Sequence, residues 1–259
     1  TQILGELGAH YIYNFEITLP FAKITENTPI HLGAEVFNLM RSPRILDAVE
    51  SLIGPEIYCN PAHHVRMKLP TKKSTGEIND LTGTVHCHQD QGGTLPEADN
   101  SNIITVWIAI SDATISNGCL MVIPRSHQGG LLPHVRIIKG GKHAGTAVRE
   151  DLLDRKNLTP LPVKRGGVIF MSARTIHGSL INESNGIRWS ADFRYQPIGR
   201  PTGRPMFPGF VARSQEHPGK ELKDHRIWAE LWLNTRAELA NKQMPVFHRW
   251  SGDSLQVID

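Results

Sequence analysis

Hydrophobic and polar residues alternate along residues 187–195, and this pattern predicts a β-strand with two different faces. Successive side chains of a strand point to opposite sides. The apolar side is expected to carry Ile187, Trp189, Ala191, Phe193 and Tyr195. The other side is expected to carry Arg188, Ser190, Asp192 and Arg194. One face should therefore pack into a core, while the opposite face presents charged groups to a polar space.

Further apolar runs predict more strands. Residues 103–110 form a nearly continuous apolar run rich in β-branched residues, so both faces of that strand are expected to be buried. Shorter runs at 119–123 and 168–171 follow turn sequences containing glycine. The stretches 126–145 and 197–218 are rich in Gly, His or Pro and are interpreted as loops. Several short strands at close spacing favour a sandwich or a barrel.

Two segments show helical periodicity. Residues 42–52 have Ser42 as a capping residue, Pro43 in the first turn and Gly54 as a stop signal. The second helix is expected at about 221–242, near the C-terminus. Its inward residues are predicted to be Ile227, Leu231 and Leu239, with Trp228 and Trp232 sharing a face. We expect this helix to pack on a sheet; a lid or a dimer contact is the alternative.

Composition narrows the class of protein. A chain of 259 residues, 39% of them hydrophobic, is long enough for one domain spanning 1–259 with a substantial core. Its 28 basic and 25 acidic residues form no basic cluster, which argues against a nucleic-acid partner. No apolar run approaches the roughly 20 residues that span a bilayer, and no signal peptide is visible. Three cysteines without a CxxC pair favour a cytoplasmic location. The sequence leaves the oligomeric state open.

His88 and Asp90 form an H-x-D pair, and His177 lies in a separate segment. On a strand, residues i and i+2 share a face, so His88 and Asp90 can approach one metal ion together. Two imidazoles and one carboxylate form the facial ligand set of non-heme Fe(II) oxygenases. An isolated H-x-D pair also arises by chance in a chain with 13 histidines, so an ordinary surface role stays open. Cys87 is rejected as a ligand because it points to the opposite face.

Arg188 follows His177 by eleven positions, and Ser190 shares its strand face. An arginine in that place can bind a carboxylate through two hydrogen bonds, and a serine hydroxyl can add a third. A surface ion pair on a solvated face is the alternative. On a regular strand Gln89 would point away from the ligand face, and on an irregular one it would turn towards the substrate. Gln89 and Gln91, the neighbours of Asp90, are candidate substrate contacts. Candidate contacts for an anion, or else ordinary solvated charges, are Arg66, Lys68, Arg125 and Arg194.

These motifs occur in an order that resembles the phytanoyl-CoA dioxygenase family of Fe(II)/2-oxoglutarate oxygenases. The resemblance covers about residues 60–195. It rests on His88-Gln89-Asp90, Trp107, Asn117-Gly118-Cys119-Leu120, Val122-Ile123-Pro124, Ser126-His127, His177-Gly178-Ser179 and Arg188. It implies a mainly β protein with flanking helices, built on a double-stranded β-helix, that is, a cupin-like jelly-roll.

The resemblance also implies the chemistry and its residues. Fe(II) would bind His88, Asp90 and His177, with 2-oxoglutarate and O2 as cosubstrates and a small molecule as substrate. The far carboxylate of 2-oxoglutarate would pair with Arg188, assisted by Ser179 or Ser190, while Thr105, Trp107 and Lys68 line its pocket. Retention of Asp90 favours hydroxylation, because related halogenases replace this carboxylate with a small residue. The alternatives are a cupin-like metal enzyme that does not use 2-oxoglutarate and a non-catalytic metal- or ligand-binding domain.

Overall fold

The computed structural model describes residues 17–19, 24–71, 85–139, 142–242, 249–250 and 255–258. Its largest element is a five-stranded sheet of order β10-β1-β9-β2-β7, paired throughout in antiparallel fashion. These strands are β1 (Ile57–Lys68), β2 (Ile104–Ala109), β7 (Val168–Ser172), β9 (Arg188–Pro197) and β10 (Phe210–Arg213). The predicted strands at 103–110, 168–171 and 187–195 are thereby confirmed.

A second antiparallel sheet has the order β6-β3-β8. Its strands are β3 (Leu120–Val122), β6 (Thr159–Leu161) and β8 (His177–Ser179). A third sheet joins β4 (His134–Lys139), β5 (Lys142–Val148) and β11 (Leu255–Ile258). The mostly antiparallel sheets and the few helices agree with the expected cupin-like jelly-roll core. That residues 1–259 form one domain stays a prediction.

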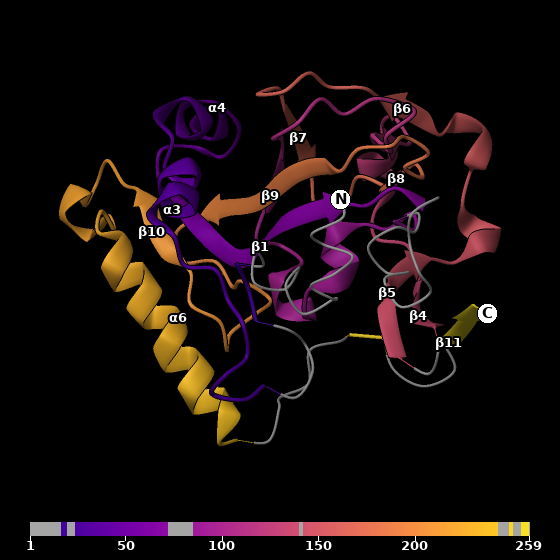
Figure 1. Cartoon of the computed structure of the whole chain (residues 1–259). Helices are drawn as coiled ribbons and strands as arrows, with labels where there is room; N and C mark the ends of the chain where they lie inside the picture. The colour runs from indigo at the N-terminus through magenta and orange to yellow at the C-terminus, as the bar shows by residue number, and fades with distance from the viewer. Residues whose placement is uncertain are drawn as a thin grey trace.

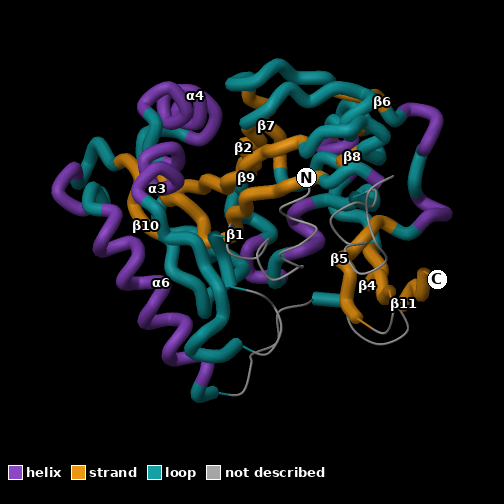
Figure 2. The backbone as a smooth tube through the Cα atoms, viewed as in Figure 1, coloured by secondary structure: helices purple, strands orange, loops and turns teal. Residues whose placement is uncertain are grey.

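The main core lies between the five-stranded sheet and the helices α3 (Ala34–Met40), α4 (Pro43–Ile53) and α6 (His225–Ala240). Figures 1 and 2 show these helices at one side of the large sheet, with β6 and β8 at the other. The alternation of β9 explains this arrangement. Ala191, Phe193 and Tyr195 are buried against the helices, and Ser190, Asp192 and Arg194 lie on the opposite face. The hydrophobic effect thus holds the helices on one face and leaves the other face for polar groups.

The two predicted helices form with one correction each. α4 follows Ser42, starts at Pro43 and ends before Gly54, which has φ +89°; the Ser42 side chain, however, makes no capping hydrogen bond. In α6 the indoles of Trp228 and Trp232 are fully buried. Leu239 is buried as predicted, but the inward placement of Ile227 and Leu231 was wrong, since they are 49% and 39% exposed. The larger indole surfaces occupy the buried stripe, which rotates the neighbouring positions outward.

Two segments interpreted as loops contain strands. Residues 126–145 include β4 and the start of β5, and residues 197–218 include β10. β4 pairs with β5 and, in parallel, with β11, while β10 pairs with the edge of β1. The pairings of β10 with β1 and of β4 with β11 thus join distant segments, whereas β4 and β5 form a local hairpin that the sequence pattern did not indicate. Among the described residues, no helix combines the length and the apolar character that crossing a membrane requires.

Candidate functional site

His88, Asp90 and His177 lie together, with one ligand atom from each residue within 4.8 Å of the others. His88 and His177 form an isolated antiparallel bridge: the N–H of each donates to the carbonyl of the other at 2.9 Å. The residue 88 segment thus extends the small sheet beside β8. Asp90 does not continue this strand, because it opens a 3-10 turn (Asp90–Gly93). The two ligand residues share one side as predicted, but the turn, not strand alternation, brings the carboxylate there.

Both imidazole rings are oriented by their own backbone. Nδ1 of His88 lies 2.8 Å from the carbonyl of His86, and Nδ1 of His177 lies 3.0 Å from that of Thr175. A proton on Nδ1 satisfies each carbonyl and leaves the Nε2 lone pair for a metal ion. The two Nε2 atoms lie 3.6 and 4.0 Å from Oδ1 of Asp90. Two nitrogen donors and one oxygen donor therefore point towards one common position.

Burial and the neighbouring His88 lower the pKa of His177 to about 4, so this ring is neutral at physiological pH. Burial alone would raise the pKa of Asp90, but the Arg194 guanidinium and the two imidazoles hold that pKa well below its ordinary value. The site thus offers one negative charge and two imidazoles. This donor set suits Fe(II) and other first-row metals better than Ca²⁺ or Mg²⁺.

The Asp90 carboxylate is held on both oxygens. Arg194 donates from Nη2 to Oδ1 at 2.9 Å, and Thr105 donates from Oγ1 to Oδ2 at 2.5 Å. Arg194 also donates from Nη1 to Asp192 at 2.6 Å, and Asp192 accepts from Arg66 Nε at 2.6 Å. Four charges of alternating sign therefore connect the metal ligand to the rim of the pocket. The interpretation of Arg194 as a solvated charge was wrong, because it is 7% exposed and pairs with two carboxylates.

The other end of the same pocket is cationic. Arg188 is buried and donates from Nη1 to Ser190 Oγ at 2.7 Å and from Nη2 to the Gly118 carbonyl at 3.0 Å. Its guanidinium lies over Trp107, 5.4 Å from the ring centroid. Its Nε is buried and has no hydrogen-bond partner among the described residues. A buried donor in this state is costly, and a bound anion would satisfy it.

Lys68 joins this cationic end from β1. It is 4% exposed and donates from Nζ to Ser179 Oγ at 2.7 Å. Burial, followed by the nearby Arg188 and Arg66, lowers the pKa of Lys68 to about 7. The expected neighbours of a carboxylate, Arg188, Ser190, Ser179, Trp107 and Lys68, are therefore brought together. Thr105 instead bonds the metal-ligand carboxylate, although it lines the same pocket as Arg188 and Trp107.

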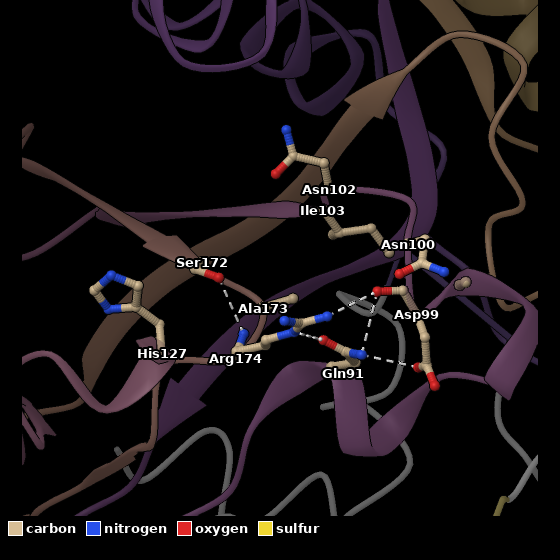
Figure 3. A pocket seen from close by; sticks show the side chains of 10 residues that line it. Gln91, Asp99, Asn100, Asn102, Ile103, His127, Ser172, Ala173 and Arg174 are labelled. Carbon is tan, nitrogen blue, oxygen red and sulfur yellow. Dashed lines mark hydrogen bonds between the residues drawn. The ribbon is translucent and has the colours of Figure 1, made fainter. Parts of the chain in front are cut away.

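The two glutamines do not lie where a substrate contact was expected. The buried Gln89 side chain donates to the carbonyls of Gly130 and Arg174 at 2.7 and 2.6 Å and accepts from the Leu132 N–H at 2.8 Å. Every polar atom of its amide thus binds backbone, away from the metal pocket. Gln91 lines a second pocket, where it donates to Asp99 and accepts from Arg174, as Figure 3 shows. Its expected role in substrate contact at the metal pocket is corrected in the same way.

Sequence reasoning also missed His134, Arg249 and Trp250. These three residues contact the 89–99 segment around Asp90. Burial lowers the pKa of His134 to about 4, so its ring is neutral. No local pattern marks these residues, because the contacts join segments that lie far apart in the chain.

The model of the phytanoyl-CoA dioxygenase (PhyH) family matches residues 16–190. A Bos taurus relative, phytanoyl-CoA dioxygenase domain-containing protein 1, is 31% identical over 131 residues, or 44% of this chain and 45% of the relative. Human peroxisomal phytanoyl-CoA dioxygenase is 29% identical over 166 residues, or 64% of this chain and 47% of the relative. The chain thus spans about half the length of these curated relatives.

Solved structures show the same fold. The apo form of the non-heme monooxygenase ThoJ matches with a TM-score of 0.61 and 20% identity, covering 82% of this chain and 77% of its own. EvdO2 from Micromonospora carbonacea var. aurantiaca, solved in complex with 2-oxoglutarate, matches with a TM-score of 0.51 and 23% identity, covering 66% and 68%. At these identities the likeness describes the fold alone.

Proposed function

The chain belongs to the phytanoyl-CoA dioxygenase family, and from this premise we propose that it is an Fe(II)/2-oxoglutarate-dependent oxygenase. Its reaction is the hydroxylation of an unactivated C–H bond in a small metabolite or natural product. One observation carries the proposal: His88 and His177, which form the converging donor set with Asp90, line the same pocket as the buried Arg188 guanidinium. A keto acid with a second carboxylate would bind the metal through its keto-acid group and the guanidinium through its second carboxylate.

Each end has a defined task. Nε2 of His88, Nε2 of His177 and Oδ1 of Asp90 would hold the iron, while Arg188 and Lys68 would bind the far carboxylate of 2-oxoglutarate. When bound, iron and 2-oxoglutarate would activate O2, the oxidant of the reaction: one oxygen atom would enter succinate as 2-oxoglutarate loses CO2, and the other would enter the C–H bond of the substrate. Ser190 and Ser179 orient the two cations through the hydrogen bonds described above. Trp107 covers the guanidinium and keeps water from it, which strengthens its attraction for a carboxylate.

The state of Asp90 supports hydroxylation over halogenation. A halogenating site needs the carboxylate position free for a halide. Here the carboxylate is present and fixed by Thr105 and Arg194. The Arg188 cluster also argues against a cupin-like metal enzyme that works without 2-oxoglutarate, since such an enzyme has no use for it. A degenerate binding domain would be expected to lack a metal ligand, and all three are present. The cytoplasmic location stays a prediction.

The test is anaerobic spectroscopy followed by turnover. Fe(II) and then 2-oxoglutarate are added to the protein without O2, and a visible charge-transfer band is expected. Arg188→Ala should need about 10- to 100-fold more 2-oxoglutarate to develop the band, because it removes charge-assisted hydrogen bonds. Arg226→Ala is the matched control, since Arg226 is an exposed arginine on α6. Succinate release with candidate substrates then identifies the substrate class. Absence of the band with iron bound would favour an enzyme that does not use 2-oxoglutarate.

A further inference from the structure

Two residues near the C-terminus contact the turn that carries Asp90. Trp250 donates from Nε1 to the carbonyl of Gly92 at 2.7 Å. Arg249 donates from Nε to the carbonyl of Thr94 at 2.7 Å, and its side chain is 7% exposed. The Arg249 guanidinium also forms a two-point contact with Asp99, with Nη2 to Oδ1 at 2.6 Å and Nη1 to Oδ2 at 3.1 Å. Both residues therefore bind backbone carbonyls within residues 92–94, and Arg249 also binds the Asp99 carboxylate.

His134 connects Trp250 to the other side of the same turn. The two rings are stacked, with centroids 5.4 Å apart and an interplanar angle of 23°. Nδ1 of His134 donates to the Leu132 carbonyl at 2.8 Å, which leaves Nε2 to accept from the N–H of Gln89 at 2.9 Å. The ring also packs closely on Gly92, where an added Cβ would come within 2.6 Å of Nε2. The backbone is thus held at the residue before Asp90 and again two residues after it.

Asp90 needs such support because its backbone has left the sheet. The ladder to β8 ends at His88, and the following residues form a short 3-10 turn. A 3-10 turn is held by fewer and poorer hydrogen bonds than a strand within a sheet. Where other contacts do not hold such a turn, the ligand that it carries has to be ordered when the metal binds, and this costs affinity.

We propose that Trp250 and Arg249 are positioning residues for the iron site, acting on Asp90 through His134 and the backbone of residues 89–94. The inference rests on the proposed function, since it requires the three ligands to bind iron. Neither residue touches the ligand atoms. Both lie beyond residues 16–190, so this support comes from outside the part of the chain that matches the family. Trp250 and Arg249 thereby support the metal site from beyond the matched part of the chain.

The test measures metal affinity and not turnover. Co²⁺ is titrated into the metal-free full-length protein, and its visible absorption gives the dissociation constant and the ligand geometry. Trp250→Phe keeps a ring for stacking on His134 but loses the donor to Gly92. Its dissociation constant should rise about 2- to 10-fold, the worth of one hydrogen bond. Trp250→Leu, which also loses the stacking, should bind more weakly than Trp250→Phe, and Arg249→Leu should show the same direction.

The controls separate positioning from general stability. Arg226→Ala removes another Arg–Asp contact, that with Asp224 at the start of α6, and should bind Co²⁺ like the wild type. The metal-free Trp250→Phe protein should melt slightly below the wild type, because it loses one hydrogen bond, and its increase in melting temperature on adding Co²⁺ should also be smaller. Equal Co²⁺ affinity in wild type and Trp250→Phe would overturn the inference and leave the proposed function intact. A wild-type protein that binds no Co²⁺ would overturn both.

Discussion

Arg194 donates to Oδ1 of Asp90 at 2.9 Å, and this is the oxygen that faces Nε2 of both His88 and His177. The same guanidinium neutralises Asp192, so it is the shared counter-charge of two buried carboxylates. A metal ion would approach Asp90 from the imidazole side while Arg194 holds it from the other. In the metal-free protein, Arg194 is therefore the positive charge that balances Asp90. A bound metal ion would take over part of this role.

Arg194→Leu should consequently destabilise the metal-free protein by about 3 kcal/mol or more, because Asp90 loses its arginine partner and Asp192 is left with Arg66 alone. Added Co²⁺ or Mn²⁺ should raise the melting temperature more in this variant than in the wild type, since the ion restores the missing charge. Arg194→Lys keeps the charge and should lie between the two. Calorimetry with and without metal measures this difference. A metal-induced increase that is equal in all three proteins would contradict the prediction.

Lys68 should take up a proton when 2-oxoglutarate binds. Its pKa in the structure is lowered to about 7 by burial and by the nearby arginines. A carboxylate beside the amine would raise that pKa again, so at pH 8 binding should draw in up to about one proton. The affinity for 2-oxoglutarate should therefore fall as the pH rises above 7. Titration calorimetry of the Mn²⁺-loaded protein, in buffers with different ionisation enthalpies, counts the protons.

Lys68→Met is the matched variant for this experiment, because it keeps the length of the side chain and removes the amine. It should bind 2-oxoglutarate more weakly than the wild type at pH 7. Its binding should also show less proton uptake between pH 7 and 9. The same proton count in wild type and Lys68→Met would show that another group titrates.

His134 should make the protein less stable in mild acid. Burial lowers its pKa to about 4, against an ordinary value of 6.5. Below pH 6.5 His134 is protonated in the unfolded chain, whereas in the native protein its ring stays neutral down to about pH 4. The free energy of unfolding should therefore be fully retained above pH 6.5 and fall by about 3 kcal/mol towards pH 4. Denaturant unfolding of wild type and His134→Gln, without metal, should show a shallower pH dependence in the variant. Parallel pH curves would exclude this role for His134.

The comparison between sequence and structure shows which features a local pattern can predict. The alternation along β9 correctly separated Phe193, which packs under the helices, from Arg188, which lies in the pocket. It worked because the strand is long and its two faces differ strongly in polarity. The pattern around residue 90 was a poorer guide: alternation placed Gln89 away from the ligand face, as observed, but Asp90 reaches the ligand site through a 3-10 turn and not through the strand. Alternation cannot indicate where a strand stops.

Contacts between distant segments could not be predicted from any periodic signal. Trp250 meets Gly92 across 158 positions, and Arg194 meets Asp90 across 104. Their partners are fixed by how the sheets and the C-terminal region pack, not by neighbouring residues. The position of Arg194 on the strand could nevertheless have indicated its place in the site, since it shares the polar face of β9 with Arg188 and Ser190. A charged residue that shares a strand face with a candidate cofactor contact is therefore itself a candidate site residue, even when no motif surrounds it.

Gly118 offers the sharpest test of how the cationic end is built. It has φ +84°, and its carbonyl accepts from Arg188. A Cβ at this position would lie 2.6 Å from the Leu180 carbonyl oxygen and 2.7 Å from Cδ of Lys68. Gly118→Ala should therefore displace Lys68 or the turn and weaken 2-oxoglutarate binding about tenfold or more. It should also lower the stability of the fold by roughly 1 kcal/mol, the cost of a side chain in this backbone conformation.

Gly54→Ala provides the matched control for that variant. Gly54 has a similar φ of +89°, lies at the end of α4, and an added Cβ would have no neighbour within 4 Å. It should lose stability from backbone strain while binding 2-oxoglutarate like the wild type. The affinity of both variants for 2-oxoglutarate is measured by following the charge-transfer band of the anaerobic Fe(II) protein. The comparison separates the effect of backbone strain from the effect of displacing Lys68. Equal affinities in the two variants would mean that the contact of Gly118 with Lys68 and Leu180 does not shape the cosubstrate site.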